Sequence, residues 1–147
     1  MNRDFTLERV PAPVPVAARE ILGGGGLKLH AREWGNPEGF PLLFIHGWSQ
    51  SDLCWLNQVS GDLADTSRMV TFDLRGHGLS EKPPGPEHYA DGQLWADDLA
   101  AVIDQTGLEQ PILVSWSYGG YVVADYLRAY GDAHIGGINL ASSATIL

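Results

Sequence analysis

The segment Pro111–Gly120 limits the possible folds of this chain more than any other part of its sequence. It begins with a short run of β-branched and aliphatic residues, Ile112 to Val114, which predicts a strand. A tight turn with Ser117 at its apex follows. The pattern after Gly120 is that of an amphipathic helix, whose apolar face holds Val122, Val123, Tyr126, Leu127 and Tyr130. A strand, a sharp turn and a helix in direct succession are typical of α/β proteins.

The turn itself has the layout of a nucleophile elbow, G-x-S-x-G, with Ser115 in place of the first glycine. In such a turn the apical serine adopts a strained backbone conformation that lifts its hydroxyl clear of the sheet. The residues two before and two after the apex come close together, and Ser115 and Gly119 are both small. Ser115 is a poorer apex, because Leu113 occupies the position two residues before it. The alternative interpretation is an ordinary strand-to-helix turn with a serine cap.

The overall charge excludes several classes of partner. The chain has 147 residues, enough for one domain with a substantial core, and 44% of them are hydrophobic. Its formal net charge of -9 argues against binding to nucleic acid or to an anionic membrane surface. The amino-terminal stretch has no uninterrupted apolar core, and no later segment is long enough to span a bilayer, so we expect a cytoplasmic protein.

The single cysteine, Cys54, excludes an internal disulfide framework and a multi-cysteine metal site. We expect it to be a small buried hydrophobic residue.

The chain before the first strands reads as a separate leader. Residues 1–17 are polar and then proline-spaced, whereas residues 18–147 read as part of one domain. Two strands, 19–22 and 27–34, are predicted around the glycine turn 23–26. The four glycines do not form a phosphate-binding loop, because no helix follows them. His30 belongs to the polar side of the second strand and is expected at the surface.

Strands and helices then alternate along the chain. Strands are predicted at 41–45, 68–72 and 135–141, in addition to the one before Ser117. A helix is expected to begin near Ser51, with Trp55, Val59 and Leu63 on its buried face, and another runs from Asp91 to Gly107. This order predicts an α/β fold with a mostly parallel sheet covered by helices on both faces.

Three polar loops follow three of these strands, starting at His46, at Asp73 and at Ser115. The carboxyl ends of parallel strands share one edge of a sheet, and ligands bind along that edge in open α/β sheets.

With these three motifs, in this order and at this spacing, the sequence resembles the α/β-hydrolase family. It is most similar to small bacterial members akin to cofactor-free haloperoxidases, perhydrolases, esterases and enol-lactone hydrolases, and the resemblance runs from about Ala18 to Leu147. The resemblance implies a small ester, lactone or related carbonyl substrate. It implies no cofactor and no metal.

The resemblance assigns the chemistry to Ser117, which would attack the carbonyl carbon and form an acyl-enzyme. The backbone N–H groups of Tyr118 and Trp48 would form the oxyanion hole. The side chains of Trp48, Trp116 and Tyr118 are candidate walls of an apolar acyl pocket, although Trp116 could equally fill the core.

A further set of residues resembles the family's loop-shaping positions, and we expect these to fix the backbone rather than perform chemistry. They are His46, Gly47, Asp73, Arg75, Gly76, His77, Gly78, Ser115, Gly119 and Gly120.

The sequence departs from the family's pattern after Ser117, where an acid and then a histidine should follow. The remaining candidates are Asp125, Asp132 and His134. His134 precedes the last predicted strand, which spans about 20 Å at about 3.3 Å per residue, so it lies at the wrong edge of the sheet.

We therefore expect the catalytic acid and base to be missing, and the chain to be the amino-terminal half of a serine hydrolase. In such a half, the strand 135–141 is expected to be an exposed apolar edge, and the face that a carboxyl-terminal helix normally covers is expected to show an apolar patch. The alternative is a non-catalytic fragment that associates with itself or with a separately encoded second half. These residues do not distinguish esterase chemistry from perhydrolase or lyase chemistry.

Overall fold

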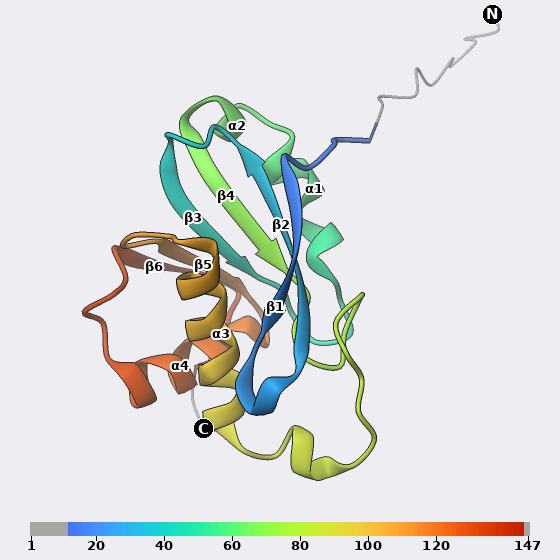
Figure 1. Ribbon diagram of the computed structural model, residues 1–147. Helices are drawn as coiled ribbons and strands as arrows, with labels where there is room; N and C mark the ends of the chain where they lie inside the picture. Colours follow the sequence, from blue (N-terminus) through green and yellow to red (C-terminus); the bar gives the residue numbers. More distant parts are fainter. Residues whose placement is uncertain (1–11, 146–147) are drawn as a thin grey trace, which may run out of the picture.

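A computed structural model describes residues 12–145 of the chain (Figure 1). It contains one sheet of six strands in the order β1-β2-β4-β3-β5-β6. The strands are β1 Ala17–Leu22, β2 Lys28–Gly35, β3 Phe40–Ile45, β4 Ser67–Phe72, β5 Ile112–Trp116 and β6 Gly137–Ala141. Strand β2 pairs antiparallel with β1 and β4, and the pairs β4-β3, β3-β5 and β5-β6 are parallel. The predicted mostly parallel α/β sheet is confirmed.

Two long helices cover one face of the sheet, α3 Gly92–Thr106 and α4 Gly119–Tyr130. They lie side by side in Figure 1 and share a core with alternate residues of the strands. Leu43 and Ile45 of β3 belong to this core, whereas Phe44 faces the opposite side and packs against Trp55. The period-two alternation of a strand accounts for this division.

The caps of α3 match the sequence prediction. The Asp91 carboxylate accepts a hydrogen bond of 2.9 Å from the Gln93 N–H at the start of the helix. Gly107 ends the helix in the left-handed conformation, at φ 64°. No helix among residues 12–145 is long and apolar enough to cross a membrane.

The helix expected from Ser51 to Leu63 is broken instead. The segment forms a 3-10 helix, Asp52–Trp55, the short α1 Leu56–Val59, and, after a gap, α2 Leu63–Thr66. The Ser60 hydroxyl donates to the Leu56 carbonyl at 2.6 Å, and the glycine at 61 has a low helix propensity, so the chain turns there.

Three expectations for single side chains fail or hold only in part. Leu63 is 44% exposed rather than buried, and Cys54 is exposed on the outer side of its short helical turn rather than part of the core. His30 is only half exposed, and its Nε2 atom is buried.

The sheet is incompletely covered at β6. Ile138 and Leu140 of β6 are 40% and 48% exposed, and Ile112 of the neighbouring strand is 39% exposed. The exposed apolar strand that the sequence predicts at 135–141 is therefore observed at β6.

The predicted leader lies largely outside the residues that the structure describes, which begin at residue 12. Val16, at its end, donates a backbone hydrogen bond of 2.7 Å to Glu33 of β2.

Candidate functional site

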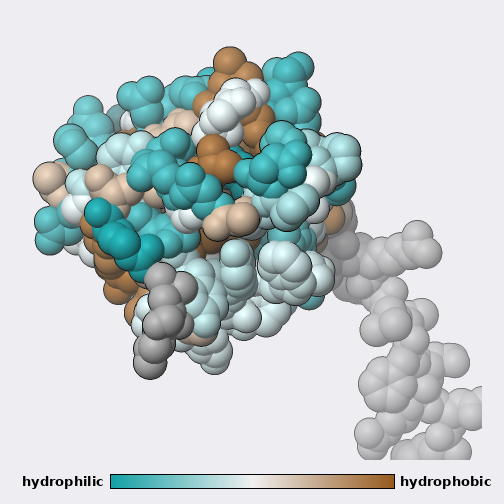
Figure 2. All heavy atoms as spheres, turned by 90° about the horizontal axis from the view of Figure 1, so that it is seen from below, coloured by the Kyte–Doolittle hydropathy of each residue, from teal (hydrophilic) through white to brown (hydrophobic). Residues whose placement is uncertain are grey.

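The three polar loops meet at one edge of the sheet. Strands β4, β3 and β5 are neighbours and run parallel, so the loops that follow them lie side by side. The arrows of β3 and β4 point downward in Figure 1, toward this edge. Figure 2 shows the molecule from below, with hydrophilic and intermediate residues over most of the face and hydrophobic ones in small separate areas.

Ser117 stands at the apex of the turn between β5 and α4, with a positive φ of 53°. This left-handed conformation is strained for a serine. Its carbonyl accepts hydrogen bonds from the N–H groups of Gly120 at 3.1 Å and Ala144 at 3.2 Å, and its own N–H donates to Ala141 at 3.4 Å. Among the described residues, all hydrogen bonds of Ser117 are made by its backbone. The side chain is half-buried.

The turn needs small residues because other backbone segments approach it closely. A Cβ on Gly119 would lie 2.5 Å from the Ile45 carbonyl oxygen, and a Cβ on Gly120 would lie 2.6 Å from that of Ala144. Gly47 also has no room for a side chain, since a Cβ there would come within 3.0 Å of the Ser117 Cβ. The loop after β3 is thereby brought against the serine.

Ser115 is buried beneath the turn and already has a partner. Its hydroxyl lies 3.0 Å from the hydroxyl of Ser143, which also donates to the Ser115 carbonyl at 3.0 Å. Ser115 therefore differs from Ser117 in being buried and in having a partner for its hydroxyl.

Trp48 and Tyr118 lie next to each other above the edge. Their ring centroids are 5.2 Å apart in an edge-on arrangement, so the loop after β3 touches the start of α4. Ser49, which follows Trp48, has a positive φ of 57° and donates its N–H to His77 Nε2 at 3.2 Å. Trp116 packs against the core cluster on the other side of the sheet, which contains Trp55.

His46 and His77 both use their ring nitrogens to hold backbone. His46 Nε2 accepts from the Leu74 N–H at 3.0 Å, and its Nδ1 donates to the Gly47 carbonyl at 2.7 Å. Burial lowers the pKa of His46 below its ordinary value of 6.5, which favours the neutral ring that these two bonds require. His77 Nδ1 likewise donates to the Arg75 carbonyl at 2.9 Å.

Asp73 joins two loops through its carboxylate. One oxygen accepts from the Asp52 N–H and the other from the Leu79 N–H, both at 2.8 Å. Asp52 in turn pairs with Arg32 of β2. Gly78, at φ 49°, leaves the space that the Asp73 carboxylate occupies.

Arg75 is fully buried and forms a two-pronged ion pair with Asp98 of α3. Its Nε lies 2.7 Å and its Nη2 2.8 Å from the two carboxylate oxygens. The guanidinium also donates to the Gly24 carbonyl at 3.0 Å, so the glycine turn 23–26 is tied to the same ion pair. Gly76, at φ 77°, passes under the Tyr89 ring, where a Cβ would lie 2.8 Å away.

Asp98 is the structural residue that the sequence analysis missed. It lies between Trp95 and Leu99 on the buried face of α3, and it is 0% exposed. A charged residue on an apolar helical stripe was the available signal, because a buried charge requires a partner of opposite sign.

A hollow of about 600 Å³ opens beside the Ser117 turn. We name it the Tyr118 pocket, after the residue that links it to the turn. Its walls include the side chains of Tyr89, Trp95, Tyr118, Tyr121, Asp125 and Arg128.

A family model for the alpha/beta hydrolase fold matches residues 41–146. That stretch contains all three loops and most of the chain. The chain belongs to the α/β-hydrolase family.

Solved hydrolase structures are similar to this chain in both fold and sequence. A Burkholderia cenocepacia protein named as an aryl esterase superposes with a TM-score of 0.85 at 44% identity, over 87% of this chain and 47% of that one. An esterase from Rhodococcus sp. ECU1013 gives a TM-score of 0.80 at 44% identity, over 87% of this chain and 46% of its own.

A curated relative carries a different activity in its name. The non-heme chloroperoxidase of Streptomyces lividans is 33% identical over 107 residues, which are 73% of this chain and 38% of that protein. The chain therefore spans less than half the length of the relatives that it matches.

Among the described residues, none of the five histidines of this chain forms a hydrogen bond with the Ser117 hydroxyl. His46 and His77 hold loop backbone, as described above. His30 lies on β2, and His88 is 3.7 Å from Glu87. His134 lies at the opposite edge of the sheet, as the sequence predicts.

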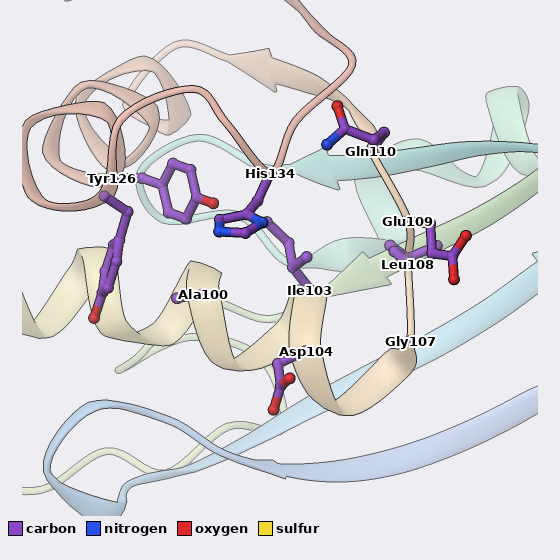
Figure 3. A pocket seen from close by; sticks show the side chains of 10 residues that line it. Ala100, Ile103, Asp104, Gly107, Leu108, Glu109, Gln110, Tyr126 and His134 are labelled. Atoms are coloured by element: carbon purple, nitrogen blue, oxygen red, sulfur yellow. The ribbon is translucent and has the colours of Figure 1, made fainter.

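His134 lines a second hollow, of about 580 Å³, at the far ends of α3 and α4 (Figure 3). Helix α4 begins at the Ser117 turn and runs back along the sheet, so its last residue, Tyr130, lies at this opposite edge. The close-up shows His134 and Tyr126 on one side of the hollow and Asp104 on another. This hollow is separate from the candidate active site.

Proposed function

We propose that this chain carries the nucleophile and the oxyanion hole of a serine hydrolase that acts on a small ester, lactone or related carbonyl compound. The observation that carries the proposal is Ser117, a serine at positive φ on the turn between β5 and α4. Burial of Ser115 beneath the turn supports the choice of serine. The esterases among the similar structures support the substrate class.

In the proposed reaction the Ser117 oxygen attacks the carbonyl carbon and forms a tetrahedral intermediate. The N–H groups of Trp48 and Tyr118 would donate to the negatively charged oxygen. The close approach of Gly47 to Ser117 supports this role, because it fixes the neighbouring Trp48 amide near the serine. Loss of one such donor costs about 3 kcal/mol of transition-state stabilisation in comparable sites.

We further propose that the base and the acid that serve Ser117 lie outside this chain. Two observations support this proposal: no histidine among the described residues forms a hydrogen bond with the Ser117 hydroxyl, and His46 and His77 use their ring nitrogens to hold backbone. Without a base the serine hydroxyl stays protonated at neutral pH, and what remains is catalysis by the oxyanion hole and by binding.

Labelling with a fluorophosphonate, located by mass spectrometry, tests the choice of nucleophile. We expect the label on Ser117, at a low rate, and no label in Ser117→Ala. Ser115→Ala is the matched control and should still be labelled. A label on Ser115, or equal labelling of many serines, would argue against the proposal.

A second candidate function is non-catalytic assembly, and the exposed strand β6 favours it. Its outer edge has no partner strand among the described residues, and Ile138 and Leu140 are half exposed. Such an edge could pair with a second chain. Light scattering over a range of concentrations would show a stoichiometric complex if this is correct, and a monomer would exclude it.

A further inference from the structure

We propose that the Tyr118 pocket binds an aryl group of the substrate, directly beside Ser117. The inference rests on the proposed function for the orientation of the ester, whose carbonyl group would lie at the serine. Binding of the aryl group does not itself require any reaction, so the two ideas can be tested separately.

The pocket is walled by aromatic rings from three segments of the chain. The Tyr118 ring centroid lies 5.4 Å from that of Trp95 and 5.5 Å from that of Tyr121. Tyr89, in the loop before α3, lies 6.4 Å from Trp95. The rings meet at tilted or edge-on angles, which is the arrangement that aromatic groups prefer. A flat aromatic ligand can make the same kind of contact with several of them at once.

The walls of the pocket are held in place by hydrogen bonds from two of their rings to backbone carbonyls. Trp95 is 3% exposed, and its indole N–H donates to the Tyr89 carbonyl at 2.8 Å. The Tyr89 hydroxyl donates to the Pro83 carbonyl, also at 2.8 Å. Because these rings are already ordered, a ligand loses less free energy in ordering them on binding.

The charged groups of the pocket neutralise each other. Asp125 and Arg128 form an ion pair of 2.5 Å on α4. The Asp125 carboxylate also packs against Gly92 at the start of α3, where a Cβ would lie 2.8 Å from it and where negative charge is favourable. With its charges paired, the pocket suits a neutral ring better than an anionic or cationic group.

The position and the size of the pocket fit a substrate group. Tyr118, the residue that follows Ser117, forms part of the wall, so the pocket opens next to the Ser117 turn. Its volume of about 600 Å³ lies within the range of small-molecule sites. The Trp48 ring touches Tyr118 and extends the aromatic surface toward the proposed oxyanion hole.

The experiment uses Ser117→Ala, so that no ester is consumed, and measures binding by chemical-shift changes in NMR spectra. Two matched pairs of probes are titrated: phenyl acetate against cyclohexyl acetate, and methyl phenylacetate against methyl cyclohexylacetate. We expect the aryl member of at least one pair to bind about tenfold more tightly and to shift the indole signal of Trp95. The pair that shows the preference reveals whether the aryl group belongs to the alcohol or to the acyl part. Equal binding within both pairs overturns the inference.

Three variants on α4, each added to Ser117→Ala, locate the site. Tyr121→Leu should reduce the aryl preference to less than about threefold, and Tyr121→Phe should retain it, since the ring is what matters. Tyr130→Leu, on the same helix but outside the pocket, is the control and should change nothing. An unchanged preference in Tyr121→Leu would contradict the inference.

The two failures are distinguishable. If Ser117 is not labelled but the aryl preference persists, the proposed nucleophile is wrong and the pocket stands. If Ser117 is labelled but no aryl preference is found, the hydrolase proposal stands and the pocket assignment is wrong.

Discussion

The loop after β4 and the turn after β5 lie at the same edge of the sheet, but they use their polar groups differently. Asp73 and Arg75, after β4, are both buried, and each bonds to several segments of the chain. Ser117, after β5, is half-buried and bonds only through its backbone among the described residues. The comparison separates the residues that hold the loops from the residue whose hydroxyl is available for chemistry.

The largest expected effect is on the free energy of unfolding, and it concerns Arg75 in the loop after β4. Arg75→Met should lower the free energy of unfolding by about 3–5 kcal/mol, because it leaves the buried Asp98 carboxylate without its partner. Urea denaturation followed by circular dichroism measures the loss. Arg128→Gln removes an arginine whose side chain is 56% exposed, and it should cost less than about 1 kcal/mol. Similar losses in both variants would show that the Arg75–Asp98 pair does not anchor the loop.

The second prediction concerns the space beside Ser117. Gly119→Ala places a Cβ 2.5 Å from the Ile45 carbonyl oxygen, so we expect a loss of about 1–3 kcal/mol and a displaced serine. Labelling of Ser117 should fall with it. Gly107→Ala is the control: its φ of 64° disfavours alanine by about 1 kcal/mol, but its site is distant from Ser117. Normal labelling in Gly119→Ala would mean that the turn tolerates a wider spacing.

The third prediction concerns pH. Burial lowers the pKa of His46 in the folded chain, so below pH 6.5 the unfolded chain binds a proton that the folded chain does not. Stability should therefore fall as the pH drops below about 6.5, by at most about 1.4 kcal/mol per pH unit from this group. Denaturation midpoints from pH 7.5 to 5 measure the slope.

His46→Gln should remove this contribution to the slope, whereas substitution of the exposed His134 by Asn should not. An unchanged slope in His46→Gln would show that His46 binds its proton equally well in the folded and the unfolded chain.

The smallest effect distinguishes the two serines. Ser117→Gly should raise the free energy of unfolding by up to about 1 kcal/mol, since glycine adopts a positive φ without strain. Ser115→Gly should lower it by about 1 kcal/mol, because the hydrogen bond between the Ser115 and Ser143 hydroxyls is lost. A Ser115→Gly variant with a higher free energy of unfolding than the parent chain would contradict the structural role given to Ser115.

The sequence predicts the order of strands and helices well, because periodicity and end signals are local. The α3 caps Asp91 and Gly107 and the buried strand before His46 are examples. It also predicts that His46, Asp73 and Ser115 start loops at one edge, since parallel strands share that edge.

What the sequence does not predict depends on partners distant along the chain. The residues next to Asp98 in the sequence do not indicate that Arg75 is its partner. Those next to Tyr121 do not indicate that Tyr89 and Trp95 line the same pocket. The helix expected from Ser51 failed because the apolar spacing of Trp55 and Val59 fits several short turns as well as one continuous helix.

The central claim is that Ser117 is a nucleophile whose base and acid lie outside this chain. The rate at which a fluorophosphonate labels Ser117 in the whole chain, measured against added imidazole, tests this. We expect slow labelling of this one serine that accelerates as imidazole takes over the missing proton transfer. Ser117 that remains unlabelled at every imidazole concentration, or is labelled no faster than the serines of the urea-unfolded chain, would contradict the claim.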